Sequence, residues 1–410
     1  MLAHIEPGAA QRPSLSRIRA DFGLTYFANG LIGFIFAATG PVAIVLSVGT
    51  GGGLSQQQIA SWVFGMFFVN ALITIAMSWR YHMPLGFAWT IPGTVLVGPA
   101  LQHLSFAEVV GAFYATSALI LLLGFSGWVK RLMSALPMPI VMGMVAGVFL
   151  RFGLDLVRAL QSDFAIAAPM ILTFVALSAL PHWGRRLPPL IGALLVGAVA
   201  IALGRSEGAA LGQFALAQPV FTAPQWSLGA LIELVVPLAI TVLVVQNGQG
   251  VAVLKAANHE PPVNAIAVAC GIGAALCASV GAVSSCLTGP TNALMTSSGE
   301  RSRHYTAALT FGSFGLLFGL MAPIFTGLML SAPKAYIMVL GGLAMLRVLQ
   351  GSFVASFGGR FTLGALISLI VTVSDVSILN IGAAFWGLVA GFACSWLMEN
   401  ADFQTLHKLG

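Results

Sequence analysis

Two short stretches decide the fold, 87-FAWTIPGTVLVGP-99 and 285-SCLTGPTNALMTS-297. Each is rich in small residues and is interrupted by Gly and Pro, whereas long apolar runs surround it. Neither is regular enough to cross a bilayer as an ordinary helix, which needs about 20 apolar residues. The question is why a membrane protein would carry two such interruptions about two hundred residues apart.

The composition indicates an integral membrane protein. Of the 410 residues, 58% are hydrophobic and only 7% are charged, and the mean hydropathy is +0.95. A soluble protein carries about 25% charged residues, so this chain could not build a soluble surface. Residues 1–23 lack the short apolar stretch and the small-residue cleavage site of a signal peptide, which favours a cytoplasmic tail.

The apolar runs predict an all-α protein with fourteen membrane segments. They lie near residues 22–47, 56–79, 85–102, 106–125, 128–151, 165–181, 188–204, 227–255, 262–281, 284–299, 305–327, 332–350, 361–375 and 380–398. With the N-terminus in the cytoplasm, four of the 18 Lys and Arg residues fall outside, namely Arg151, Arg158, Arg205 and Lys334. The other fourteen fall inside, in keeping with the positive-inside rule.

This charge distribution has two consequences. We expect both chain ends to lie in the cytoplasm and the protein to lie in the inner membrane. The net charge of +6 then reflects membrane topology, so nucleic acid is not an expected partner.

The two halves of the chain resemble each other. The stretches 191-IGALLVGAVA-200 and 381-IGAAFWGLVA-390 agree at six of ten positions. Four further pairs share one offset of 196 residues, namely Pro137 with Pro333, Met142 with Met338, Leu150 with Leu346 and Arg151 with Arg347. Because each half has seven segments, an odd number, the second half is inverted in the membrane. Inverted repeats are typical of secondary transporters, whose binding site lies at mid-membrane between the repeats.

The repeat divides the chain into five parts. They are a cytoplasmic tail (1–21), a first repeat (22–204), an external linker (205–226), a second repeat (227–398) and a C-terminal cytoplasmic tail (399–410).

The two opening stretches now fall in segments 3 and 10, which are equivalent places. Irregular backbone at membrane depth is tolerated where it is buried in protein or lines a cavity. We therefore expect extended segments that lead into half-helices, each with free N–H groups and about half a positive charge at its start. Two such ends that face one cavity would bind an anion without Lys or Arg. The residues expected there are Thr90, Gly93, Thr94, Gly289, Thr291 and Asn292. The alternative is an ordinary Pro kink in each of two continuous helices.

Other residues are candidates for the same site. In 244-VVQNGQGVAV-253, the amides of Gln246, Asn247 and Gln249 are costly in lipid and should face a cavity. Their alternative role is hydrogen bonding between helices. Thr39 precedes Gly40-Pro41 at the corresponding place in the first segment. The aromatic residues nearby are Phe36, Phe87 and Trp89, which could hold a planar ring or simply pack in the core.

Four motifs together resemble the BenE-type benzoate/proton symporters. They are FANGLIGFIFAATGP (27–41), GFAWTIPG (86–93), QNGQG (246–250) and LTGPTNA (287–293). The resemblance covers nearly the whole chain and implies the 7+7 inverted-repeat fold of uracil permease-like transporters. It also implies a core domain (22–125 with 227–327), a gate domain (126–204 with 331–398) and a substrate between the half-helix ends of segments 3 and 10.

One departure from the wider fold concerns charge. Uracil-type relatives carry acidic residues in segment 8 and at the start of the segment 10 half-helix, where this chain has Gln246 to Gln249 and Gly289 to Asn292. The loss of negative charge suits an anionic substrate and removes the obvious proton carrier.

We therefore expect a secondary active transporter that imports benzoate or a similar aromatic carboxylate together with a proton. The carboxylate would bind at Gly93, Thr94, Thr291 and Asn292 with help from Gln246 and Asn247, and the ring would lie among Phe36, Phe87 and Trp89. Glu233, early in segment 8, is the carboxylate that we favour as proton carrier. Co-transport of the neutral acid stays open.

Several alternatives are weighed against this expectation. A nucleobase or another small organic anion could be the substrate, and a channel would use similar half-helices. The G-x-S-G match at 124-GFSG-127 suggests a hydrolase, but no His lies at mid-membrane to activate Ser126, so we expect no enzyme. The seven His and four Cys residues form no ligand motif, so neither a metal nor a cofactor is expected. The oligomeric state stays open, with a homodimer as one alternative.

Overall fold

The computed structural model describes residues 5–10, 12–129, 131, 137–180, 187–204, 215–297, 299–376, 378 and 383–409. The expected all-helical architecture is confirmed, with one small antiparallel sheet of two three-residue strands at its centre. Some expected regions lie outside the described residues. They are residues 1–4 of the expected tail, the loop residues 132–136 and 181–186, and the first half of the expected linker (205–214).

The first half contains short α1 (Leu15–Asp21) and then a helical element in each expected range. Its elements are α2 (Leu24–Ala38), α3 (Gly40–Gly51), α4 (Gln56–Phe64), the π-helical turn η2 (Gly65–Val69), α5 (Asn70–Tyr81), β1 (Phe87–Trp89), α6 (Ile91–Ala100), α7 (Phe106–Ser126), α9 (Met138–Ser162), α10 (Phe164–Ala179) and α12 (Pro189–Gly204). The first segment breaks at Thr39, because Pro41 starts a new helix there.

The second half repeats this order. Its elements are α13 (Leu228–Ala230), η3 (Leu231–Val235), α14 (Val236–Ile240), η4 (Thr241–Gln246), α15 (Asn247–Ala256), α16 (Val263–Ser279), β2 (Ser285–Leu287), α17 (Gly289–Met295), the 3-10 turn η5 (Arg301–Arg303), α18 (Tyr305–Leu320), α19 (Ala322–Leu330), α20 (Lys334–Phe357), α21 (Thr362–Val373), α22 (Ala383–Met398) and α23 (Asn400–Leu409).

Within the described residues, six helices are long and apolar enough to cross a membrane. The number is seven if the helices Arg301–Leu320 and Ala322–Leu330, which meet at a bend, count as one span. The remaining expected ranges hold shorter apolar helices of 10–17 residues and the seven-residue α17. The protein is thus a multi-pass helical membrane protein, while the number of fourteen crossings stays a prediction.

The expected boundaries of two segments were wrong. The fifth segment was expected at 128–151, but α9 runs from Met138 to Ser162, and the twelfth was expected at 332–350, but α20 runs to Phe357. Arg151 and Arg347 therefore lie within helices rather than at helix ends. Charged residues are tolerated inside α9 because Arg151 and Arg158 line a cavity and pair with carboxylates.

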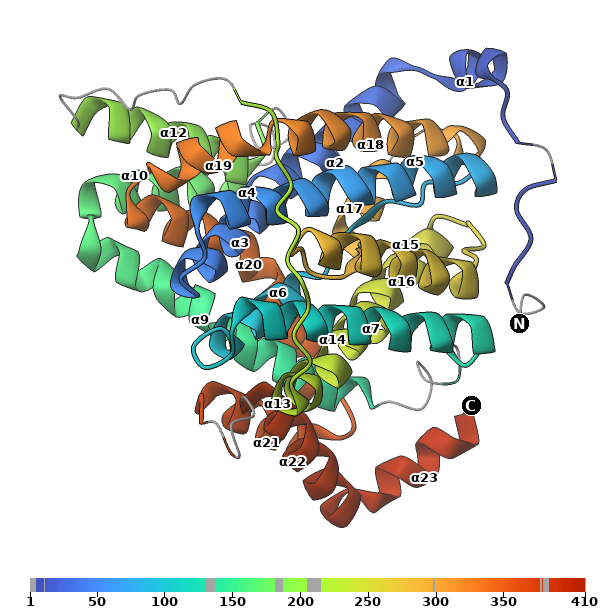
Figure 1. Cartoon of the computed structure of the whole chain (residues 1–410), viewed down its shortest axis with the longest axis vertical. Helices are drawn as coiled ribbons and strands as arrows, with labels where there is room; N and C mark the ends of the chain where they lie inside the picture. Colours follow the sequence, from blue (N-terminus) through green and yellow to red (C-terminus); the bar gives the residue numbers. More distant parts are fainter. Residues whose placement is uncertain are drawn as a thin grey trace.

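The two helices also support the repeat. Pro137 and Pro333 are the N-cap residues of α9 and α20, and the helices begin 196 residues apart, as the sequence matches predict. α9 and α20 pack along each other, and they join α10, α12, α21 and α22 in one group. In Figure 1, α10 and α12 lie at the upper left of this group and α21 and α22 at the bottom.

The remaining helices form a second group, in which α18 packs on α2 and α5 and α7 packs on α16. α3 contacts α20, and α6 contacts α9, so these helices join the two groups. The described part of the linker runs extended across the front of the molecule in Figure 1, where the amides of Ala217 and Gln225 donate to the carbonyls of Leu320 and Ala107. The marked chain ends lie on the same side of the view.

The strands β1 and β2 cross at the centre of the second group. They pair antiparallel, with Phe87 opposite Leu287, Ala88 opposite Cys286 and Trp89 opposite Ser285. α6 follows β1 directly and α17 follows β2 directly, so the two helices leave the crossing in opposite directions. The expectation of an extended segment leading into a short helix thus agrees with the structure in both halves.

Candidate functional site

A small enclosed cavity lies where the starts of α6 and α17 approach the helices α9 and α20. The core side of its wall is formed by Phe36, Ile91, Pro92, Val245, Gln246, Gln249 and Pro290, and the opposite side by Met142, Val145, Phe149, Met345, Val348 and Ser352. We call it the central cavity. Its volume is about 30 Å³, enough for one or two water molecules. An aromatic acid would therefore fit only after α9 and α20 move away from the core side.

The sequence explains why these residues meet. Pro92 and Pro290 each stand in the first turn of a half-helix, where a missing N–H costs nothing, and both line the central cavity. The π-helical turn η4 ends at Gln246, and α15 begins at Asn247. Gln246 and Gln249 are three residues apart and so share one face of the helix, the face toward the cavity.

The two glutamine amides are the polar groups of the central cavity that suit an anion. Gln246 is buried, and neither amide has a hydrogen-bond partner among the described residues. No described residue that lines the cavity is acidic or basic. Each amide NH₂ group offers two donors, so the cavity can solvate a carboxylate without repelling it.

The wall formed by α9 and α20 reflects the repeat. Phe149 of α9 and Met345 of α20 are separated by the repeat offset of 196 residues, and both line the central cavity. The two halves thus contribute equivalent positions to one apolar wall, which would contact the ring of an aromatic ligand.

Asn247 and Asn292, which were expected to bind substrate, hold the strand crossing instead of lining the cavity. The Oδ1 atom of Asn247 accepts from the N–H of Leu287 at 2.7 Å. The amide of Asn292 bonds to both backbone groups of Gly86 at 3.0 Å and donates to the carbonyl of Thr288 at 2.6 Å. Both side chains are buried, so their hydrogen-bonding capacity is used within the protein.

The expected residues on the half-helix starts also bond internally. Thr90 caps α6, since its Oγ1 accepts from the N–H of Gly93 at 3.1 Å, and Thr94 donates its hydroxyl proton to the Thr90 carbonyl at 3.0 Å. On α17, the Thr291 hydroxyl donates to Thr288 at 3.2 Å. Thr288 itself makes no side-chain cap, so the start of α17 is less fully capped than that of α6.

Four further expected residues lie outside the cavity wall. Phe87 and Trp89 belong to the buried core, where the Trp89 ring lies 5.1 Å from that of Phe67. Thr39 lines a separate apolar crevice between α2, α12 and α19. Gly289 allows close packing, because a Cβ atom there would lie 2.8 Å from the Cβ of Gln249. Of the three expected aromatic residues, Phe36 lies at the central cavity.

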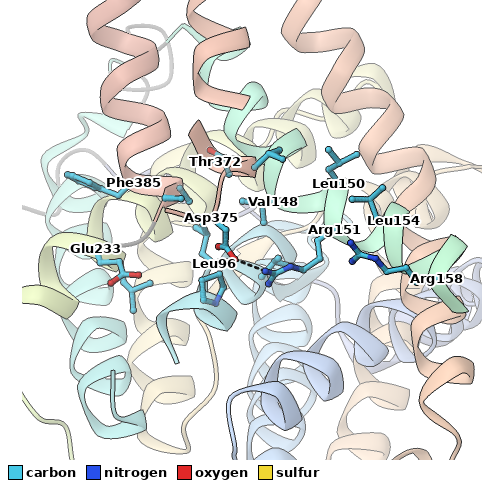
Figure 2. Close-up of a pocket in the computed structure, with 17 residues that line it drawn as sticks. Leu96, Val148, Leu150, Arg151, Leu154, Arg158, Glu233, Thr372, Asp375 and Phe385 are labelled. Atoms are coloured by element: carbon cyan, nitrogen blue, oxygen red, sulfur yellow. Dashed lines mark hydrogen bonds and ion pairs between the residues drawn. The ribbon is translucent and has the colours of Figure 1, made fainter. Parts of the chain in front are cut away.

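Glu233 lies on the π-helical turn η3 and is almost completely buried. Its Oε2 lies 2.9 Å from Nε2 of His103, in the connection between α6 and α7. Figure 2 shows Glu233 at one side of a second cavity, beyond Leu96, with Arg151 and Asp375 on the other side. Glu233 was predicted from the sequence, but His103 was missed. His103 is 130 residues away from Glu233 in the chain, and no sequence motif marks it.

Other functional candidates were only partly visible in the sequence. Gln249 stood out as a polar residue in an apolar run, and the structure places it on the cavity wall. Phe149, Met345 and Ser352 carried no distinguishing signal, except that Phe149 and Met345 obey the repeat offset.

Comparison with known proteins finds similar membrane proteins along nearly the whole chain. The chain is 31% identical to the inner membrane protein YdcO of Escherichia coli (strain K12) over 90% of its length and 94% of that protein. It is 27% identical to the benzoate membrane transport protein of Acinetobacter baylyi over 94% of its length and 98% of that protein.

Solved structures share the inverted-repeat transporter fold. The transmembrane domain of a cyanobacterium bicarbonate transporter, BicA, superimposes with a TM-score of 0.63 at 17% identity over 90% of this chain and 98% of that one. SLC26A9 superimposes with a TM-score of 0.58 at 13% identity over 92% and 66% of the two chains. The model of the BenE family, the benzoate membrane transport proteins, matches residues 20–397, and the chain belongs to this family.

Proposed function

We propose that the chain is a secondary active transporter that imports benzoate or a similar aromatic carboxylate with a proton. The observation that carries this proposal is the central cavity, where two half-helix starts and the amides of Gln246 and Gln249 meet and none of the described lining residues is charged. The name of the Acinetobacter relative, a benzoate membrane transport protein, supports the substrate class.

In this proposal the substrate lies with its carboxylate toward Gln246 and Gln249 and its ring between Phe36 and Phe149. The carboxylate accepts hydrogen bonds from the amides, and the partial positive charge of the helix starts adds to the attraction. The remaining expected residues keep these groups in place, namely Thr39, Phe87, Trp89, Thr90, Gly93, Thr94, Asn247, Gly289, Thr291 and Asn292.

We further propose fourteen crossings in the inner membrane, with both chain ends in the cytoplasm. The core domain (22–125 with 227–327) slides against the gate domain (126–204 with 331–398) and carries the substrate across. This motion is needed because the central cavity is too small for the substrate in the present conformation. On this orientation the Glu233 side of the protein faces outward.

A proton would drive the uptake. The inside-negative potential opposes anion entry by about 2.3 kcal/mol per 100 mV, so accumulation needs a coupled cation. Glu233 with His103 is our proposed proton carrier, since it is a buried carboxylate that faces a cavity between the core and gate helices. π-Helical turns often occur at functional sites, and Glu233 lies on the turn η3 while Gln246 lies on the turn η4.

The test is uptake of labelled benzoate into proteoliposomes with and without an inward proton gradient. Accumulation that depends on the gradient is the expected result. Equal uptake under both conditions would make the protein a facilitator and contradict symport. Competition with unlabelled uracil identifies the alternative substrate class: uracil that is transported in place of benzoate would show that the binding site recognises a nucleobase.

A further inference from the structure

A second cavity of about 270 Å³ lies beyond the central cavity and is drawn in Figure 2. Val95 and Leu96 of α6 line it, one turn after Pro92, which lines the central cavity. On α9, Val148 and Arg151 line it, next to Phe149 of the central cavity. We call this second cavity the vestibule. It continues the central cavity along the same two helices toward one end of the molecule.

Two guanidinium groups line the vestibule, those of Arg151 and Arg158, and Arg151 is held by a carboxylate from another part of the chain. Nη2 of Arg151 lies 2.9 Å from Oδ2 of Asp375, and both side chains are about half exposed. Figure 2 shows the two side chains pointing toward each other from α9 and the end of α21. Exposed ion pairs of this kind contribute about 0–1 kcal/mol, so Arg151 can exchange its carboxylate partner at little cost.

Arg151 differs from Arg158 in its partner, because Asp375 follows α21, whereas Arg158 pairs with a residue of its own helix, and we therefore take Arg151 as the anion-binding group. Arg158, which also lines the vestibule, is paired with Asp155 at 3.0 Å one turn earlier on α9. The Glu233 carboxylate bonds to His103 and lies on the opposite side of Leu96 in Figure 2.

The walls of the vestibule match the rest of an aromatic acid. Leu96, Val148, Leu154 and Phe385 provide apolar surface around the Arg151–Asp375 pair. An aromatic carboxylate has one charged end and one flat apolar end, and the combination of the Arg151 guanidinium and an apolar wall fits both ends. A purely apolar ligand would leave the ion pair unused, and an inorganic anion would leave the apolar wall uncovered.

We propose that the vestibule is a second binding site for the aromatic carboxylate, where Arg151 exchanges Asp375 for the carboxylate of the ligand before the ligand enters the central cavity. This inference rests on the proposed function, because it assumes that the chain transports such a ligand. It assigns to Asp375 the role of an internal substitute for the substrate, which keeps Arg151 in position while the vestibule is empty.

The test compares Arg151→Gln and Asp375→Asn with the control Arg347→Gln. Arg347 is the repeat equivalent of Arg151, contacts Gln350 and is not among the residues that line the vestibule or the central cavity. Labelled benzoate uptake is measured over a range of concentrations in proteoliposomes. Arg151→Gln should raise KM about tenfold with little change in the maximal rate. Asp375→Asn should lower KM, because Arg151 loses its competitor, and Arg347→Gln should match the wild type.

The two variants should change KM in opposite directions, which distinguishes an effect on binding from misfolding, since a destabilised variant would not lower KM. Unchanged KM in both variants, with wild-type protein active, would overturn the vestibule site and leave the proposed function intact. Loss of maximal rate alone in Arg151→Gln would also overturn it, because that result indicates a structural role. Wild-type protein that neither binds nor transports benzoate would refute the proposed substrate, and the vestibule site with it.

Discussion

The side chain of Asn292 bonds to both backbone groups of Gly86, a residue from the other half of the chain. Its Oδ1 accepts from the N–H of Gly86, and its Nδ2 donates to the carbonyl of Gly86, both at 3.0 Å. Together with the bond from the N–H of Thr288 to the carbonyl of Gly86 at 3.2 Å, these bonds tie the start of α17 to the chain before β1.

Asn292→Ala should therefore destabilise the protein before it affects substrate recognition. The buried N–H of Gly86 would lose its acceptor, at about 1–3 kcal/mol, whereas its carbonyl would keep the bond from the N–H of Thr288. We expect the thermal midpoint in detergent to fall by several degrees, whereas Ser297→Ala, which removes an exposed hydroxyl five residues further along the chain, should leave it unchanged. An unchanged midpoint combined with weaker benzoate binding would instead assign Asn292 a direct contact with the ligand.

Gln246→Glu tests the charge selectivity of the central cavity. The substitution keeps the shape of the side chain but places a carboxylate where the amide was, and like charges repel strongly at low dielectric. We expect benzoate uptake to fall by at least about tenfold, and Gln246→Ala to have a smaller effect. Gln102→Glu, a similar change at an exposed residue outside the cavity, is the matched control. Equal uptake by Gln246→Glu and the wild type would place the carboxylate elsewhere.

Gly40→Ala tests the sliding of core against gate. Gly40 begins α3 in the proposed core, and a Cβ atom there would lie 2.1 Å from the Cβ of Ala344 in α20 of the proposed gate. The added methyl group should force the two helices apart and slow transport. Gly40→Ala combined with Ala344→Gly removes the clash and should restore the rate. A double variant as slow as the single one would show that the close approach does not control the motion.

The fold was largely predictable, because membrane segments leave a strong trace in composition. Long apolar runs located the helices, and Pro92 and Pro290 located the half-helix starts, since few other arrangements tolerate such interruptions at membrane depth. The boundaries of α9 failed because Arg151 and Asp155 looked like the end of a segment. They lie inside a helix because each finds a partner of opposite charge.

The site was less predictable, because the same residue type serves different roles. Gln246 and Asn292 are both buried amides in small-residue stretches, and they differ in whether a backbone group lies within about 3 Å. Only the three-dimensional structure supplies that information. The same holds for His103, whose importance depends on a carboxylate far away in the chain.

A histidine outside the membrane segments makes stability depend on pH. Burial, the neighbouring His304 and Arg301 lower the pKa of His259 from 6.5 to about 4. The unfolded chain therefore binds a proton below about pH 6.5 that the native protein excludes, so stability should fall as the pH drops from about 6.5 to about 4. Thermal midpoints across this range should fall less in His259→Gln. Parallel slopes for variant and wild type would contradict this assignment.

Glu233→Gln tests the proton carrier. The amide imitates the protonated carboxyl group and cannot release a proton, so the variant should exchange labelled for unlabelled benzoate but should not accumulate it under a proton gradient. Wild-type protein should do both. Glu300→Gln, which changes an exposed carboxylate in the loop before η5, should behave as the wild type.

The His103 partner sharpens the same prediction. His103 lies 2.9 Å from Glu233, and His103→Gln keeps a side chain that can donate a hydrogen bond but removes the imidazole. If the pair shares the transported proton, this variant should shift the pH at which uptake is half-maximal and keep exchange intact. Gradient-driven accumulation that survives in Glu233→Gln would exclude Glu233 as the carrier. It would then favour entry of the neutral acid, because that route needs no titrating side chain.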